Sequence, residues 1–143
     1  MKVKIEQLDG PFHFRAVNET GNTVDMDDGS AGEGPPKGVG PMQMLAMALG
    51  GCSGIDIVSI LRKSRQPVES FKMEIEGERE TGAVPSLYTH LHAKYFFTGA
   101  LDEEKVRRAI RLSMEKYCSV AKTLERSAAI SYSFNINGRA FDS

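Results

Sequence analysis

Three runs of the chain alternate apolar and polar residues with the two-residue period of a β-strand that has one wet face. The first two runs, residues 71–78 and 87–98, are separated by the turn-forming residues 81–85. We therefore predict an antiparallel hairpin within residues 68–98. The third run predicts a last strand within residues 129–138.

The first 28 residues carry shorter extended segments. Residues 3–8, 12–17 and 23–26 are predicted strands, because turn-forming residues separate them. Residues 27–41 follow, and they contain too many Gly and Pro residues for a regular element. We expect a three-stranded meander over residues 1–28 and then a loop.

One predicted helix, over residues 41–65, is apolar nearly all round. It begins at Pro41, whose missing N–H is one that a helix start cannot satisfy internally. A helix without a wet face is enclosed by protein on most sides. Ala46, Gly50 and Gly54 recur every four residues and form a ridge that admits a close neighbour. A helix that breaks just after Gly50 is the alternative.

Two further helices are predicted within residues 102–127. Asp102 is expected to cap the first and Ser119 the second, shorter one. The complete order is three strands, a helix, two strands, helices and a last strand. Hairpins mixed with helices favour an α+β fold with mostly antiparallel sheet, and we expect residues 1–143 to form one domain.

Composition narrows the possible partners. The chain has 143 residues, of which 41% are hydrophobic, so a single core is feasible. Eighteen basic and nineteen acidic residues give a formal net charge of -1. A near-neutral chain has no electrostatic reason to bind nucleic acid or anionic lipid, and we expect neither as a partner.

Residues 38–61 lack Lys, Arg and Glu and are long enough to consider as a membrane span. Asp56 lies within them, and a carboxylate at mid-bilayer costs about 2.5–3.5 kcal/mol. We therefore predict a buried helix and no membrane association. The N-terminal residues lack the apolar stretch of an export signal, so we expect a cytoplasmic protein.

Cys52 and Cys118 are the two cysteines of the chain. In a reducing cytosol they are buried thiols, metal ligands or redox groups. Placement between two helices favours a thiolate at Cys118. Asp56, one turn beyond Cys52 on the same helix face, disfavours a thiolate there unless a cation intervenes. If the sulfurs meet, they form a two-cysteine redox site; inert burial is the alternative.

Two sequences around these cysteines are distinctive: Gly40-Pro-Met-Gln-Met-Leu-Ala-Met-Ala-Leu-Gly-Gly-Cys-Ser-Gly-Ile-Asp-Ile-Val and Glu115-Lys-Tyr-Cys-Ser-Val. They resemble the two signature helices of the OsmC/Ohr family, the osmotically inducible and organic hydroperoxide resistance proteins, and are most similar to its OsmC-like branch. The resemblance extends over essentially the whole chain. It implies an intertwined homodimer in which sheets of both subunits wrap around two central helices.

The resemblance also implies roles for the two thiols. Cys52 falls on the family's peroxide-attacking position and Cys118 on its resolving position. The implied substrate is an organic hydroperoxide, the implied reductant an external dithiol, and no cofactor is expected.

Family peroxidases place an arginine over the thiolate and hold it with a glutamate ten residues before the first cysteine. That position is Met42 in this chain, and the amide of neighbouring Gln43 cannot replace a carboxylate. Arg15 is the expected arginine, with a solvated strand residue as the alternative. We expect the substrate pocket to be formed by five residues: Met42, Gln43, Met47, Asp56 and Tyr117.

Other signals are weaker. His90 and His92 share a strand face and, with the two cysteines, would supply four zinc ligands, but that face carries Lys94 and we expect no metal. The glycines of residues 29–40 match no phosphate-binding fingerprint. Because Met42 replaces the glutamate, a non-catalytic dimer that binds or senses a small apolar ligand is the alternative function.

Overall fold

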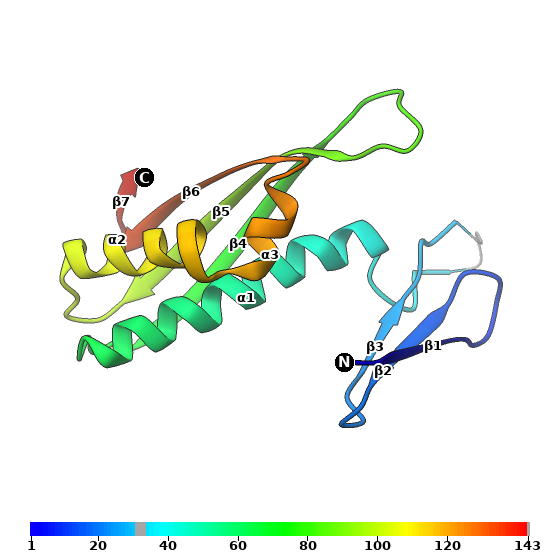
Figure 1. The fold of residues 1–143 in the computed structure, drawn as a ribbon, viewed down its shortest axis with the longest axis horizontal. Coiled ribbons are helices and arrows are strands. Elements are labelled where there is room, and N and C mark those ends of the chain that lie inside the picture. Colours follow the sequence, from blue (N-terminus) through cyan, green and yellow to red (C-terminus); the bar gives the residue numbers. More distant parts are fainter. Residues whose placement is uncertain (31–33, 143) are drawn as a thin grey trace. The chain divides into compact units, whose positions relative to one another are not determined.

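The computed structural model describes residues 1–30 and 34–142. It divides into two compact units, Met1–Leu45 and a second unit that begins at Ala46 (Figure 1). Each unit is described by itself. The mixed α+β class predicted from the sequence is confirmed.

The first unit is a three-stranded antiparallel meander, as predicted, formed by β1 (Val3–Gln7), β2 (Phe14–Asn18) and β3 (Thr23–Met26). The Gly/Pro loop returns to β3, because the backbone N–H of Val39 donates to the Asp25 carbonyl at 3.1 Å. Gly38 permits this approach, since a Cβ there would lie 2.4 Å from the Asp25 oxygen. Residues 31–33 of the predicted loop lie outside the described residues.

The second unit contains a four-stranded sheet in the order β4-β5-β6-β7. Its strands are β4 (Ser70–Arg79), β5 (Tyr88–Thr98), β6 (Ala129–Ile136) and β7 (Arg139–Asp142). The β4–β5 hairpin is antiparallel as predicted, whereas β5 and β6 are parallel. A parallel pair needs a long crossover, and the helices between β5 and β6 provide one.

Strand β7 was not predicted. It pairs antiparallel with β6 across Asn137 and Gly138, which have φ values of 51° and 88°. Asn-Gly between two strands is a strong signal for a two-residue hairpin turn, because both residues accept positive φ. This signal was present in the sequence.

Helix α1 (Pro41–Lys63) is continuous, so the alternative of a break after Gly50 is wrong. The Gln43 side-chain oxygen accepts the backbone N–H of Gly40 at 2.9 Å, which satisfies one donor of the helix start. The glycine ridge faces side chains of β4. A Cβ on Gly54 would lie 2.5 Å from Met73 Cε, so the ridge lets α1 pack directly on the sheet.

One chain alone does not enclose α1 on most sides, so the predicted enclosure stays a prediction that depends on the expected homodimer. Ile55 is 74% exposed and Met47 is 52% exposed. By length and composition α1 could cross a membrane, a criterion that the core helix of a soluble protein also meets.

Helices α1 and α2 (Glu103–Leu112) pack on one face of the four-stranded sheet (Figure 1). Fully buried side chains from all three form the core: Leu49, Ile57, Leu61, Leu91, Tyr95, Phe97, Val106 and Ile110. Asp102 caps α2 as predicted, since its carboxylate accepts the N–H of Lys105 at 3.0 Å. A π-helical turn, η1 (Ser113–Tyr117), then leads to α3 (Ser119–Leu124). Cys118, and not Ser119, caps α3.

Candidate functional site: a thiol pair beside a carboxylate

Three side chains of the second unit meet between α1 and the start of α3. They are Cys52 in the middle of α1, Asp56 one turn later and Cys118 at the end of η1. The two sulfur atoms and a carboxylate oxygen of Asp56 all lie within 4.8 Å of one another. Both thiols are free. The fold therefore brings together two cysteines that are 66 positions apart in sequence.

Local structure explains this convergence. Residues four apart on a helix share a face, which places Asp56 beside Cys52. Cys118 leaves the helical conformation, with ψ at 100°, and its N–H donates to the Ser113 carbonyl at 2.8 Å. The Cys118 sulfur in turn accepts the backbone N–H of Ala121 at 3.3 Å. The π-helical turn and the cap together fix the sulfur position.

Buried hydroxyl groups form hydrogen bonds next to the thiol pair. Tyr95 Oη donates to Ser53 Oγ at 2.8 Å, and Ser53 Oγ donates to the Leu49 carbonyl at 2.8 Å. Ser113 Oγ donates to Asp56 Oδ2 at 3.1 Å. Sequence reasoning missed Ser53, Tyr95 and Ser113. Their own residue types carry no functional signal, because buried serines and a strand tyrosine are common in ordinary cores.

The two thiols differ in burial. Cys118 is fully buried, whereas Cys52 is partly exposed. Burial raises the pKa of the Cys118 thiol to about 12, and the adjacent Cys52 sulfur adds to the rise. The argument from helix placement, which favoured a thiolate at Cys118, is therefore wrong. Burial also raises the pKa of Tyr95 to about 12, so its hydroxyl remains a neutral donor.

Comparison with known proteins identifies the family. A family model described as "OsmC-like protein" matches residues 34–133. The chain belongs to the OsmC-like protein family. It is 39% identical over 137 residues to Protein YhfA of Escherichia coli strain K12, with 95% of this chain and 98% of that protein covered.

Solved structures agree with this assignment. A hypothetical protein from Aquifex aeolicus VF5 is 30% identical, with a TM-score of 0.83 and 95% of each chain covered. The organic hydroperoxide resistance protein OhrB of Bacillus subtilis superimposes with a TM-score of 0.66 over 94% of this chain and 98% of that chain. Its identity of 14% shows a common fold only. The resemblance to the OsmC/Ohr family is thus confirmed.

Of the five residues predicted to form the pocket, Asp56 lies beside the sulfurs. Met42 and Gln43 lie in the first turn of α1, where Gln43 caps the helix. Met47 and Tyr117 are about half exposed, at 52% and 49%.

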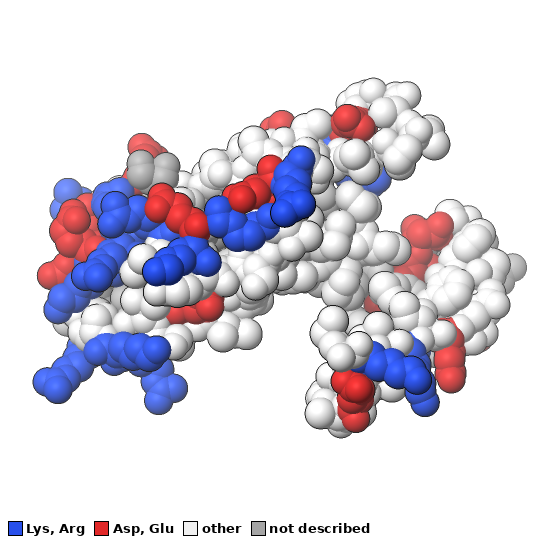
Figure 2. Space-filling model, viewed as in Figure 1, with Lys and Arg blue, Asp and Glu red and all other residues white. Residues whose placement is uncertain are grey.

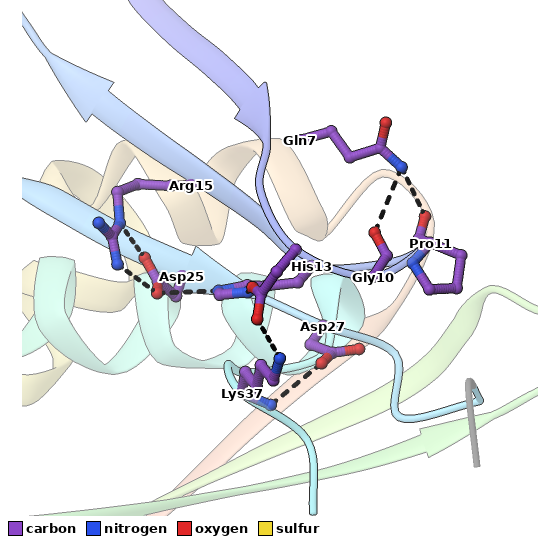
Figure 3. Close-up of polar contacts among 9 residues, drawn as sticks. Gln7, Gly10, Pro11, His13, Arg15, Asp25, Asp27 and Lys37 are labelled. Atoms are coloured by element: carbon purple, nitrogen blue, oxygen red, sulfur yellow. Dashed lines mark hydrogen bonds and ion pairs between the residues drawn. The ribbon is translucent and has the colours of Figure 1, made fainter. Parts of the chain in front are cut away.

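Arg15, the arginine expected from the family pattern, belongs to the first unit. Its Nε and Nη2 donate to the two carboxylate oxygens of Asp25 at 2.6 and 2.8 Å (Figure 3). Asp25 was missed by sequence reasoning, although it lies on the neighbouring strand. The guanidinium thus has a bidentate carboxylate partner that differs from the family's glutamate position at Met42.

His90 and His92 do not join the cysteines. They alternate along β5 with Leu91 and Ala93, which are buried, and so point to the opposite face of the sheet. Their ring nitrogens contact the hydroxyl of Ser131 at 2.8 and 2.7 Å. The four-ligand zinc set considered from the sequence is therefore not assembled.

An apolar groove runs along α1. Its volume is about 810 Å³. It lies between α1 and β4 and is lined by Gly51, Gly54, Ile55, Val58, Ser59, Arg62, Lys63, Phe71 and Met73. Lys and Arg side chains gather over α2 and the C-terminal end of α1 on the face shown in Figure 2. The groove is thus apolar along its length and basic at one end.

Proposed function

We propose that this protein is a thiol-dependent peroxidase that reduces organic hydroperoxides in defence against oxidative stress. The proximity of the two sulfur atoms is the observation that carries the proposal, because a two-cysteine cycle needs a partner thiol within reach. Cys52 is the attacking group, since it is the thiol open to solvent. Membership of a family that includes hydroperoxide resistance proteins supports the same assignment.

The cycle balances without a cofactor. The Cys52 thiolate attacks one peroxide oxygen, the O–O bond breaks, and the second oxygen takes a proton and leaves as an alcohol. The Cys118 thiol then condenses with the Cys52 sulfenic acid, which releases water and forms a disulfide. A disulfide has an S–S distance of about 2.05 Å, so the sulfurs must close by less than about 3 Å. An external dithiol restores both thiols by exchange.

We also propose that the functional form is a cytoplasmic homodimer. The exposed apolar residues of α1 require a cover, and Ile55 alone is 74% exposed. The first unit has little core of its own, because Val3 and Ile5 on β1 are each 57% exposed. A second copy of this chain would cover both surfaces. Asp56 within α1 argues against a lipid environment for the same helix.

Steady-state consumption of an organic hydroperoxide in the presence of a small dithiol tests the catalytic proposal. The wild-type protein should consume the peroxide, and Cys52→Ser should reduce the rate to that of the dithiol alone. Intact mass after mild peroxide treatment should show an internal disulfide in each wild-type chain. Equal rates for the two proteins would eliminate the proposal.

A second function has its own supporting observation. The Asp56 carboxylate lies within 4.8 Å of both sulfurs, and a nearby negative charge disfavours a thiolate. A non-catalytic dimer that binds or senses a small apolar ligand is compatible with that environment. Thiol labelling across pH separates the two functions. Labelling of Cys52 that begins only well above about pH 8.5, where a free thiol ionises, favours the binding protein.

A further inference from the structure

The reduced thiol pair and Asp56 have the composition of a metal site. Two sulfur atoms and one carboxylate oxygen converge within 4.8 Å. Thiolate sulfur, imidazole nitrogen and carboxylate oxygen are the zinc ligands of proteins, and three protein ligands with an open fourth position are typical of catalytic zinc. This set differs from the zinc set considered from the sequence. Asp56, which shares a helix face with Cys52, takes the place of the two histidines.

We propose that the reduced protein binds one Zn²⁺ per chain through Cys52 Sγ, Cys118 Sγ and one oxygen of Asp56, and that disulfide formation releases it. The binding step does not depend on the proposed peroxidase activity.

The ligand atoms need little movement to surround an ion. Zn–S bonds are about 2.3 Å and Zn–O bonds about 2.0–2.2 Å, so tetrahedral ligands lie roughly 3.5–3.8 Å apart. The observed separations, all within 4.8 Å, exceed that by about 1 Å at most. Side-chain adjustment of this size does not require the helices to move.

The site offers a divalent cation one carboxylate without an ion pair to a described residue and two thiols that can lose their protons. Among the described residues of the second unit, the ion pairs do not include Asp56. Its carboxylate accepts a neutral hydroxyl from Ser113, which leaves its charge uncompensated beside two ionisable thiols. On binding, Zn²⁺ replaces both thiol protons, which pass to solvent, and no electron is transferred. The net charge of the cluster is therefore unchanged.

Groups behind the ligands already hold them in place. Ser113 Oγ donates to one Asp56 oxygen at 3.1 Å and leaves the other available. The Ala121 N–H donates to Cys118 Sγ at 3.3 Å, a contact that stabilises a thiolate. Such outer contacts orient metal ligands and raise affinity. The partial exposure of Cys52 gives the ion a path from solvent. Soft thiolates select zinc over Mg²⁺ or Ca²⁺.

The test uses tag-free, full-length protein, reduced under anaerobic conditions and freed of metal by a chelator. Zn²⁺ is titrated against a chromophoric chelator, and Co²⁺ is added separately to detect sulfur-to-metal charge-transfer absorption. We expect one Zn²⁺ per chain. Cys118→Ser should weaken binding by more than about tenfold and diminish the cobalt absorption, and Asp56→Asn should weaken it by about tenfold. Glu104→Gln, an exposed carboxylate on α2, is the matched control and should bind as the wild type does.

Oxidation provides a second readout. Converting the wild type to its internal disulfide should release the ion, because both sulfur ligands are consumed. Wild-type affinity no higher than that of Cys118→Ser, with circular dichroism unchanged, would overturn the metal site. Chelator-treated protein is assayed for peroxide consumption in parallel. Peroxide consumption without zinc binding defeats only this inference, and zinc binding without consumption defeats only the proposed function.

Discussion

Two polar clusters in this chain differ in whether their charged side chains form ion pairs. In the first unit five charged residues, Asp9, His13, Arg15, Asp25 and Lys37, form a cluster in which each has an ion-pair partner (Figure 3). The His13 ring contacts Asp9 and Asp25 through its two nitrogens at 2.6 and 3.0 Å, Arg15 pairs with Asp25, and Lys37 pairs with Asp9. In the thiol site a single carboxylate, Asp56, lies beside two thiols and receives only a hydroxyl hydrogen bond from the described residues around it.

This difference indicates that the paired cluster has a structural role and the thiol site a chemical one. The paired cluster ties β2, β3 and the Gly/Pro loop together, and Asp27 adds a hydrogen bond from the Lys37 backbone at 3.0 Å. Its ions are already satisfied, so they have little left to offer a ligand. The thiol site keeps its ionisable groups uncompensated, which makes their protonation and bonding responsive to what enters. Chemical reactivity is therefore expected at the thiol site and not in the paired cluster.

Removal of the resolving thiol should have the largest effect, which is on peroxide turnover. Cys118→Ser should stall after one turnover, because the Cys52 sulfenic acid then has no partner within the site. We expect release of one alcohol per chain in a rapid-mixing experiment and capture of the sulfenic acid by a dicarbonyl trap. Full multiple turnover by this variant would show that Cys118 is not the resolving residue.

Removing the unpaired charge should have the next largest effect. Asp56→Asn deletes a negative charge within 4.8 Å of both sulfurs, so thiolate formation becomes easier. Alkylation at fixed neutral pH should become about tenfold faster. Glu104→Gln should label at the wild-type rate, because that carboxylate lies on α2 and is exposed. Unchanged labelling of Asp56→Asn would mean that the carboxylate does not govern the thiols.

The sequence predicted the parts of the fold that follow from periodicity. The β4–β5 hairpin, the meander of the first unit and α1 follow from two-residue alternation, turn residues and a long apolar run. The parallel pairing of β5 with β6 was missed, although a helical crossover between two strands indicates it. Strand β7 was missed as well, because the Asn137-Gly138 signal was not used.

The site was predictable only in part. Cys52 and Asp56 share a helix face, so their proximity follows from spacing alone. Cys118 could be joined to them only through the resemblance, because no local pattern spans 66 positions. Burial raises the pKa of the Cys118 thiol, which overturns the prediction from helix placement that this thiol ionises easily. Asp25 could not be found as the partner of Arg15 without the register of β2 and β3.

Loss of the buried hydrogen bond between Tyr95 and Ser53 should have a smaller effect, which is on stability. Tyr95→Phe removes the donor to Ser53 Oγ in a fully buried position and should lower the free energy of unfolding by about 1–2 kcal/mol. Denaturant unfolding under reducing conditions measures it. Tyr132→Phe is the control, since none of the described hydrogen bonds involves its hydroxyl. Equal losses for the two variants would mean that this hydrogen bond contributes nothing specific.

The paired cluster should produce the smallest effect. Arg15, Lys37 and Asp9 are about half exposed or more, and ion pairs at the surface contribute little. Hydrogen bonds to Asp9 and Asp25 raise the pKa of His13 above its ordinary value of about 6.5. The stability that His13 contributes is then complete below about pH 6.5 and is lost as pH rises through the raised value. Lys37 and His13 hold the pKa of Asp9 well below its usual range, so the Asp9 contribution is lost as pH falls below about 3.9.

The predicted pH dependence of the His13 contribution is tested by amide hydrogen exchange in β2 and β3. Exchange is measured between pH 5 and 8 and corrected for intrinsic rates. Protection relative to His13→Gln should be greatest near pH 5 and should diminish toward pH 8, because the imidazolium loses its proton and with it both charge-assisted contacts. His90→Gln provides the control, since the His90 ring contacts the Ser131 hydroxyl and not a carboxylate. A difference between wild type and His13→Gln that grows with pH would reverse the assignment, and would mean that neutral His13 is the form that holds the two strands together.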